Sequence, residues 1–135
     1  MSTDQTPLPQ PASRETILVA EDDPALLNLV RLFLQRDGYQ VLAAPDGPQA
    51  IELLKAHGQQ VALALLDMHM PGMSGVECLL AMKKLKPGFK ALILTGSPEY
   101  YEAANLGNPV GVLFKPIQRA VLLEEIRKAI AAPAA

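Results

Sequence analysis

Five short apolar runs alternate with five helix-like segments, and no other feature of this 135-residue chain restricts its fold as strongly. The runs have the length of β-strands and cover residues 16–20, 40–44, 61–66, 91–94 and 110–114. The third and fourth runs are uninterrupted apolar residues, which is typical of strands buried on both faces of a parallel sheet. Strict alternation therefore predicts a doubly wound α/β fold, (βα)5, in which helices cover both faces of a five-stranded parallel sheet through right-handed crossovers.

The segments between the runs carry the signals that begin and end helices. Asp23 and Pro24 suit the N-cap and first turn of one helix, and Gly38 ends it. Ser74 and Glu77 form a capping-box pattern at the start of another helix. The five helices are expected at residues 24–37, 48–57, 74–86, 97–106 and 117–130.

We expect the folded domain to span residues 15–132. Residues 1–14 contain three prolines and no apolar period, so a disordered tail is predicted there, with a short second tail at residues 133–135. Half of all residues are apolar and 19% are charged, which excludes a mostly disordered chain. The length suits a single domain with one self-sufficient core.

Composition also excludes several classes of function. The net charge of −2 argues against direct binding of nucleic acid, which needs a positive surface. No apolar run approaches the roughly 20 residues that cross a bilayer, and the N-terminus lacks a signal-peptide pattern, so we expect a cytoplasmic chain without membrane contact. The single cysteine, Cys78, excludes an internal disulfide and a cysteine-rich zinc site.

Acidic, hydroxyl or amine side chains follow four of the five predicted strands. In chain order these are Glu21, Asp22 and Asp23, then Asp67, Thr95 and Lys115. The carboxyl ends of parallel strands meet at one edge of the sheet, where ligands bind in open α/β folds. Crowded carboxylates repel one another and need a counterion, and oxygen ligands favour a hard cation such as Mg²⁺.

This set of side chains suits metal-assisted phosphoryl transfer. One carboxylate serves as the nucleophile in such a reaction, while the lysine and the threonine hold phosphoryl oxygens. The acids at residues 21–23 also have a plainer interpretation, because carboxylates are favourable at a helix N-terminus.

Four short motifs resemble the receiver domains of response regulators, the signalling proteins of two-component systems. They are LVAEDD at residues 18–23, LLDMHMPGMSG at 65–75, LTG at 94–96 and FKP at 114–116. Each motif is weak alone, but the four occur in order, each at a predicted strand end, and the resemblance covers residues 16–130. It implies a flavodoxin-like receiver architecture with strand order 2-1-3-4-5.

The resemblance also implies a role for each strand-end residue. Asp67 would accept a phosphoryl group from a histidine kinase or a histidine phosphotransfer protein. Mg²⁺ would be held by Glu21, Asp22, Asp67 and the backbone carbonyl of His69. Thr95 and Lys115 would bind the phosphoryl group, and the Lys115–Pro116 peptide bond would be cis. Such a domain signals by conformational change to a downstream protein and catalyses only its own phosphorylation and dephosphorylation, so we do not expect an enzyme.

Two features depart from the family's pattern. Val112 stands where receivers usually have an aromatic residue, and Phe114 lies too near Lys115 to be an obvious substitute. The segment between Thr95 and Lys115 is short, so we expect a truncated fourth helix and an irregular approach to the fifth strand at residues 107–109. The main alternative is therefore a receiver-like interaction module that no longer switches.

An enzyme is a second alternative. A phosphohydrolase usually has a second aspartate two residues after the nucleophile, where this chain has His69, and a flavodoxin would need a hydroxyl-rich loop where this chain has three acids. We interpret His69 as a side chain at the rim of the site that tunes how water reaches the phosphoryl group. Tyr100 and Tyr101 are compatible with a partner-facing surface or with packing against the sheet.

The sequence after Ile130 is too short for a DNA-binding output domain. We therefore expect either a single-domain regulator that acts by contact with an unknown downstream protein, or a receiver cut from a longer chain. A homodimer is compatible with either arrangement.

Overall fold

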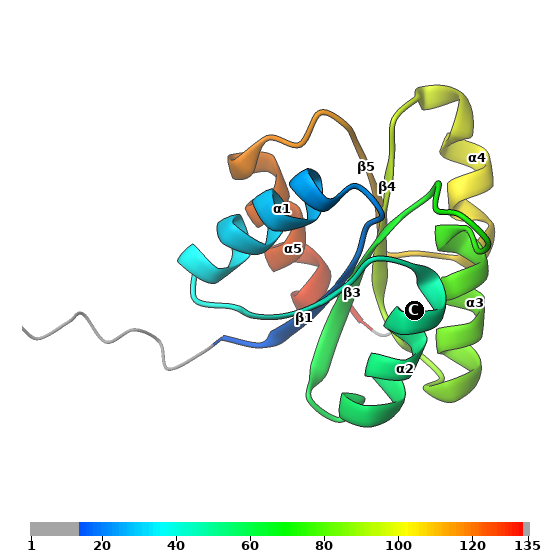
Figure 1. Cartoon of the computed structure of the whole chain (residues 1–135), viewed down its shortest axis with the longest axis horizontal. Helices are drawn as coiled ribbons and strands as arrows, with labels where there is room; N and C mark the ends of the chain where they lie inside the picture. Colours follow the sequence, from blue (N-terminus) through cyan, green and yellow to red (C-terminus); the bar gives the residue numbers. More distant parts are fainter. Residues whose placement is uncertain (1–13, 134–135) are drawn as a thin grey trace, which may run out of the picture.

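The computed structural model describes residues 14–133 and contains one five-stranded parallel sheet in the order β2-β1-β3-β4-β5 (Figure 1). Its strands are β1 (Thr16–Ala20), β2 (Gln40–Ala44), β3 (Val61–Asp67), β4 (Ala91–Thr95) and β5 (Gly111–Phe114). The helices are α1 (Pro24–Arg36), α2 (Gly47–His57), α3 (Gly75–Leu85), α4 (Tyr101–Ala104) and α5 (Arg119–Ala131). The predicted doubly wound (βα)5 fold and its strand order are confirmed.

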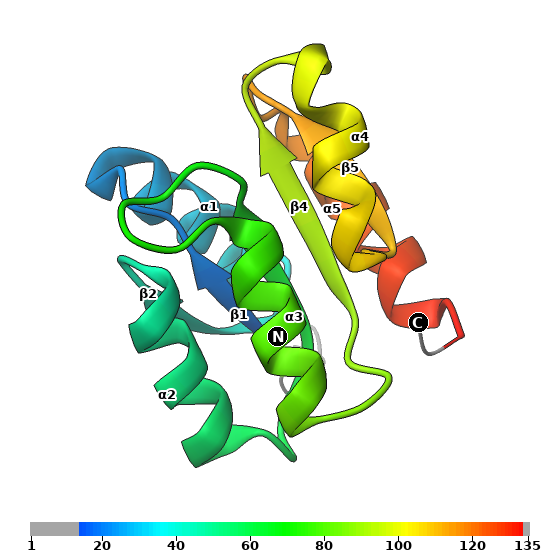
Figure 2. The ribbon, with the colours of Figure 1, turned by 90° about the vertical axis from the view of Figure 1, so that its right-hand side faces the viewer.

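The sheet separates two hydrophobic cores. Helices α1 and α5 cover one face, and α2, α3 and α4 cover the other (Figures 1 and 2). Alternate residues of β3 pack into the two cores: Leu63 and Leu65 contact the α1/α5 side, and Ala64 and Leu66 contact the opposite side. All four are fully buried, which explains why the central strand is an uninterrupted apolar run.

The order of the strands reverses at β1, which pairs with β2 on one side and β3 on the other. The helices that follow β1 and β3 leave the sheet on opposite faces. A reversal of this kind opens a crevice beyond the carboxyl ends of the two strands, where open α/β sheets bind their ligands.

Side chains cap the starts of the first three helices. Asp23 accepts a backbone N–H of α1 at 3.0 Å, and Ser74 and Glu77 form the predicted capping box of α3 at 3.1 and 2.9 Å. Helix α2 begins one residue before the predicted Pro48, because Asp46 caps it by accepting a backbone N–H at 2.8 Å.

The fourth helical segment is truncated, as predicted. Helix α4 has four residues and lies between two 3-10 turns, Pro98–Tyr100 and Asn105–Gly107. Asn108 then adopts the left-handed backbone conformation with φ 56°, and its carbonyl accepts a hydrogen bond from Lys83 Nζ at 2.9 Å. The chain therefore reaches β5 through a turn and not through a longer α4.

The described residues include Arg14, which the sequence analysis placed in the tail. Its backbone N–H donates to the carbonyl of Gly38 at 2.9 Å, and its guanidinium lies 5.3 Å from the centroid of the Tyr39 ring. The rest of the predicted tail segments, residues 1–13 and 134–135, lie outside the described residues. No helix between residues 14 and 133 has the length and apolar character needed to span a membrane.

Candidate functional site

Four strand ends bring the predicted site residues to one edge of the sheet. Asp67 and Thr95 are the last residues of β3 and β4, and Glu21 and Lys115 directly follow β1 and β5. Strand pairing in β3 continues through Asp67, opposite Leu94, and pairing in β4 continues through Thr95, as expected for the strand-end residues. Parallel neighbouring strands thus place an acid, a hydroxyl and an amine around one crevice.

Three carboxylates form a compact cluster in this crevice. Oxygens of Glu21, Asp22 and Asp67 all lie within 4.8 Å of one another. Glu21 and Asp67 are almost fully buried, with 1% and 2% of their surface exposed, whereas Asp22 is exposed. Glu21 Oε2 accepts the backbone N–H of Asp23 at 3.0 Å, which fixes the carboxylate at the start of α1.

Lys115 lies between the two buried carboxylates. Its Nζ is 3.1 Å from Asp67 Oδ1 and 3.3 Å from Glu21 Oε1. These are ion-pair distances, but the same two oxygens are buried without a hydrogen-bond donor in favourable geometry among the described residues. One ammonium also balances only one of three carboxylate charges. The cluster therefore carries an excess of negative charge, and two of its carboxylate oxygens lack a hydrogen-bond donor. Both features fit a divalent hard cation bound by oxygen ligands.

Burial changes the acid–base behaviour of the pair. Desolvation is the main reason why the pKa of Glu21 rises from 4.5 to about 7, and the nearby charge of Asp67 adds to it. The N–H of Asp23 and the ammonium of Lys115 act in the opposite direction and are outweighed. For Lys115, partial burial lowers the pKa, but the close contact with Asp67 and its charge, followed by those of Glu21, raise it overall.

Thr95 and His69 border the cluster without contacting it in the described hydrogen-bond network. The Thr95 side chain is fully buried, and its hydroxyl makes only long contacts with the backbone of Ser97, at 3.4 and 3.5 Å. His69 is exposed, and its ring meets the ring of Tyr100 edge-on, with centroids 4.4 Å apart. The role of the His69 carbonyl as a metal ligand stays a prediction.

The backbone around Lys115 is tied to the neighbouring strand. Its N–H donates to the carbonyl of Thr95 at 2.9 Å, so the two phosphoryl-binding candidates share a backbone hydrogen bond. The Lys115–Pro116 peptide bond, for which the family resemblance implied a cis form, is cis.

Gly75 is a residue of the site that sequence reasoning missed. A Cβ at this position would lie 2.5 Å from the backbone oxygen of Asp67, so only glycine lets α3 begin directly against the end of β3. The Gly75 N–H donates to the carbonyl of Met68 at 3.0 Å and holds the loop that follows Asp67. The glycine directly after the Ser74 cap was the available signal.

The positions that depart from the family pattern lie on the α4 side of the sheet. Val112 is partly buried against the core formed with α2, α3 and α4. Phe114 is 42% exposed, and its ring stacks on that of Tyr101 with centroids 6.2 Å apart and planes at 25°. Phe114 thus contacts α4 directly. Strand alternation correctly places Phe114 on the same face of the sheet as Val112, but it does not predict the contact with Tyr101.

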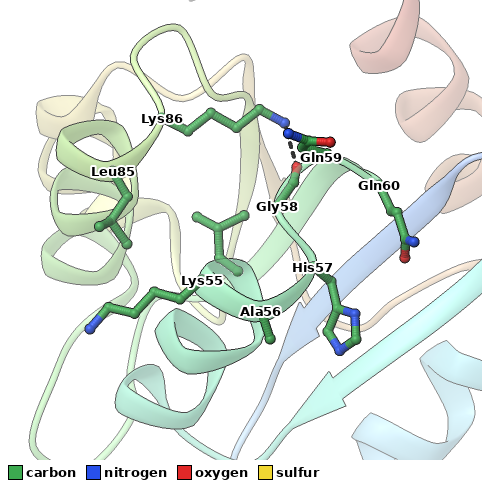
Figure 3. A pocket seen from close by; sticks show the side chains of 9 residues that line it. Lys55, Ala56, His57, Gly58, Gln59, Gln60, Leu85 and Lys86 are labelled. Carbon is green, nitrogen blue, oxygen red and sulfur yellow. Dashed lines mark hydrogen bonds between the residues drawn. The ribbon is translucent and has the colours of Figure 1, made fainter.

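A pocket of about 650 Å³ lies elsewhere, between the C-terminal ends of α2 and α3 (Figure 3). Lys86, on its wall, donates from Nζ to the carbonyls of Gly58 and Val61 at 2.7 and 3.2 Å. This lysine stabilises the Gly58 carbonyl at the C-terminal end of α2 and the Val61 carbonyl at the start of β3. None of the strand-end residues lines this cavity, so the chemistry described above belongs to the opposite edge of the sheet.

A model of the response regulator receiver domain family matches residues 17–127. The chain belongs to that family. The receiver assignment accounts for the acid cluster, the lysine and the strand order together, and it confirms the resemblance found in the four sequence motifs.

Several known proteins are similar to this receiver domain. The transcriptional regulatory protein GlrR of Escherichia coli is 33% identical over 116 residues, which cover 84% of this chain but only 26% of GlrR. The chain therefore spans about a quarter of that relative. A receiver domain protein from Clostridium thermocellum superposes with a TM-score of 0.82 at 28% identity, covering 87% of this chain and 95% of the other.

A third similar protein is also a response regulator. The response regulator TrrA of Thermotoga maritima, in complex with Mg²⁺ and BeF, superposes with a TM-score of 0.78 at 27% identity. The superposition covers 86% of this chain and 99% of TrrA.

Proposed function

We propose that Asp67 accepts a phosphoryl group from a histidine kinase or a histidine phosphotransfer protein in a reaction that requires Mg²⁺. A carboxylate oxygen of Asp67 attacks the phosphorus of a phosphohistidine, and a new O–P bond forms as the P–N bond breaks. The electron pair of the broken bond stays on the imidazole nitrogen. Asp67 suits this role because it ends the central strand β3 beside Lys115.

The neighbouring residues divide the remaining work. Glu21, Asp22, Asp67 and the His69 carbonyl would hold Mg²⁺, which when bound offsets the negative charge of the phosphoryl oxygens. Lys115 would contact one phosphoryl oxygen, since its Nζ already lies 3.1 Å from Asp67 Oδ1. The Thr95 hydroxyl would bind another, because its present contacts of 3.4 and 3.5 Å hold it only weakly.

One observation carries this proposal: a lysine ammonium reaches two nearly buried carboxylates whose facing oxygens have no hydrogen-bond donor in favourable geometry. Burying like charges together costs free energy unless something else pairs with them. A core that served stability alone would not need such a group at the edge of the sheet. A bound divalent cation would supply the missing partner.

The proposal is tested by incubating the protein with acetyl phosphate, with Mg²⁺ or with EDTA, and measuring the intact mass. We expect the mass of one added phosphoryl group only in the presence of Mg²⁺, and none in Asp67→Asn. Asp46→Asn is the matched control, because asparagine still caps α2 and this residue lies outside the acid cluster. Equal labelling of Asp67→Asn would refute the assignment.

We further propose that phosphorylation changes the conformation of residues 95–116 and thereby the contact with a downstream protein in the cytoplasm. The alternative is a receiver that no longer switches, and two observations favour it: Val112 lacks an aromatic ring, and α4 has only four residues. Hydrogen exchange with and without beryllofluoride and Mg²⁺ separates the two. Changed protection across residues 95–116 supports a switch, and unchanged protection with demonstrated binding supports the inert module.

A further inference from the structure

The pocket between the C-terminal ends of α2 and α3 has an apolar part formed by two leucines (Figure 3). Leu54, from α2, is only 3% exposed, whereas Leu85, the last residue of α3, is 48% exposed. Leu85 therefore presents about half of its surface to solvent at the side of a hollow. Covering such a surface with another apolar group is favourable.

Basic side chains accompany these leucines, and none of the described residues that line the pocket is acidic. In Figure 3 the side chain of Lys55 extends from α2 toward α3, whereas that of His57 points to the other side. Lys55 pairs with Glu52 at 3.2 Å, but both side chains are exposed, and an exposed pair of this kind is weak. A carboxylate from another molecule can therefore take the place of Glu52.

Lys86 supplies a second cation, whose position is fixed. Its Nζ donates to the carbonyls of Gly58 and Val61 at 2.7 and 3.2 Å and lies 5.5 Å from the centroid of the Phe89 ring. An ammonium group has three N–H donors, so these two hydrogen bonds leave one for a further acceptor. Because the side chain is already held in place, binding an anion there costs little side-chain entropy.

Lysines near the C-terminal end of a helix are favourable without any ligand, because they offset the negative end of the helix dipole. That effect accounts for the sign of the charge but not for a half-exposed leucine beside a hollow. We propose that this pocket is a docking site for an acidic segment of a partner protein that inserts an apolar side chain between Leu54 and Leu85. The carboxylates of the segment would pair with Lys55 and Lys86.

The position of the pocket separates this docking site from the phosphorylation site. The ends of α2 and α3 lie at the edge of the sheet opposite Asp67, and none of the strand-end residues lines the pocket. A partner held there leaves the acid cluster accessible. The inference goes beyond the proposed function and does not depend on it, because the contact needs no phosphoryl group. A concave site also suits a protruding side chain, which a flat bilayer does not supply.

The test is an NMR titration of the isotope-labelled full chain with a synthetic peptide in which glutamates flank two central leucines and both ends are blocked. We expect the amide signals of residues 54–60 and 85–86 to shift and those of Asp22 and Asp67 to stay. A peptide with glutamines in place of the glutamates should bind about two- to twentyfold more weakly, and added salt should weaken the acidic peptide. Equal affinities, shifts away from the pocket, no shift at millimolar peptide, or binding only to phosphatidylserine vesicles would overturn the proposal.

Two pairs of variants locate the contact. Lys55→Gln should weaken binding of the acidic peptide by about two- to fivefold, and Leu85→Gln by about three- to tenfold. Their matched controls, Lys128→Gln and Leu80→Gln, should bind like the wild type. Lys128 makes a similar ion pair on α5, and Leu80 is 47% exposed on α3, but neither lines the pocket. A control that loses as much affinity as its matched variant would refute docking at the pocket. Asp67→Asn should bind the peptide normally, so failure to phosphorylate the chain would refute only the proposed function.

Discussion

The raised pKa of Glu21 makes a quantitative prediction about stability. Because its pKa is about 7 in the folded chain and 4.5 as a model acid, the folded state binds more protons than the unfolded state between these values. The free energy of unfolding contributed by this group therefore falls as pH rises through that window. Above it, the protein bears the full cost of a charged carboxylate that burial has desolvated.

The variant Glu21→Gln removes this cost. The difference between 4.5 and about 7 corresponds to roughly 3 kcal/mol of stability. The variant also gives up the 3.3 Å ion pair with Lys115 but keeps an oxygen that can accept the N–H of Asp23. We therefore expect Glu21→Gln to be more stable than the wild type by about 1–3 kcal/mol at pH 8, and by little at pH 4.5.

The assay is urea unfolding followed by far-ultraviolet circular dichroism, in EDTA, at the two pH values. Glu52→Gln is the control, since Glu52 is exposed and pairs only with exposed Lys55 at 3.2 Å, a type of pair that contributes about 0–1 kcal/mol. The same stability difference for Glu21→Gln at both pH values, or a variant less stable than the wild type at pH 8, would show that burial does not penalise the charge.

Three further predictions concern the metal, the core and the start of α3. Mg²⁺ at one hundred times its dissociation constant should stabilise the wild type by about 2.7 kcal/mol, seen as a higher Tm in calorimetry, and Asp22→Asn should lose most of that gain; an undiminished gain would exclude Asp22 as a ligand. Leu79→Ala, at a fully buried position, should cost about 2–5 kcal/mol in urea unfolding, whereas Leu80→Ala, at a position 47% exposed, should cost under about 1 kcal/mol. Gly75→Ala should lower stability by at least about 1 kcal/mol and slow labelling of Asp67, because its Cβ would approach the Asp67 carbonyl to 2.5 Å; normal labelling and stability would contradict this.

The elements and the strand-end residues were predictable because their signals are local. The apolar run at residues 16–20 and the capping pair at Ser74 and Glu77 match β1 and the start of α3. The parallel sheet predicted that Asp67 and Lys115 lie at the same edge, since the carboxyl ends of parallel strands point the same way. Their closeness depended further on the strand order, which the family resemblance implied.

Contacts between distant side chains were not predictable in the same way. The rings of His69 and Tyr100 are 31 positions apart in the sequence, and nothing near either residue specifies the other. The stack of Phe114 on Tyr101 depends on how the shortened α4 packs beside β5. Such contacts follow from loop geometry, which a pattern of apolar residues does not encode.

The short length of α4 affects how much free energy a conformational change in this part of the chain would require. A four-residue helix has too few internal hydrogen bonds to persist alone, so the packing of its buried Ala104 against the core holds its shape. A change of about 1.4 kcal/mol alters the ratio of two conformations tenfold. One hydrogen bond from Thr95 or Lys115 to a charged phosphoryl oxygen contributes about 1.5–3 kcal/mol. The short α4 thus favours an inert module. It also lowers the free energy that phosphorylation of one residue would need to supply to shift the conformation of this region.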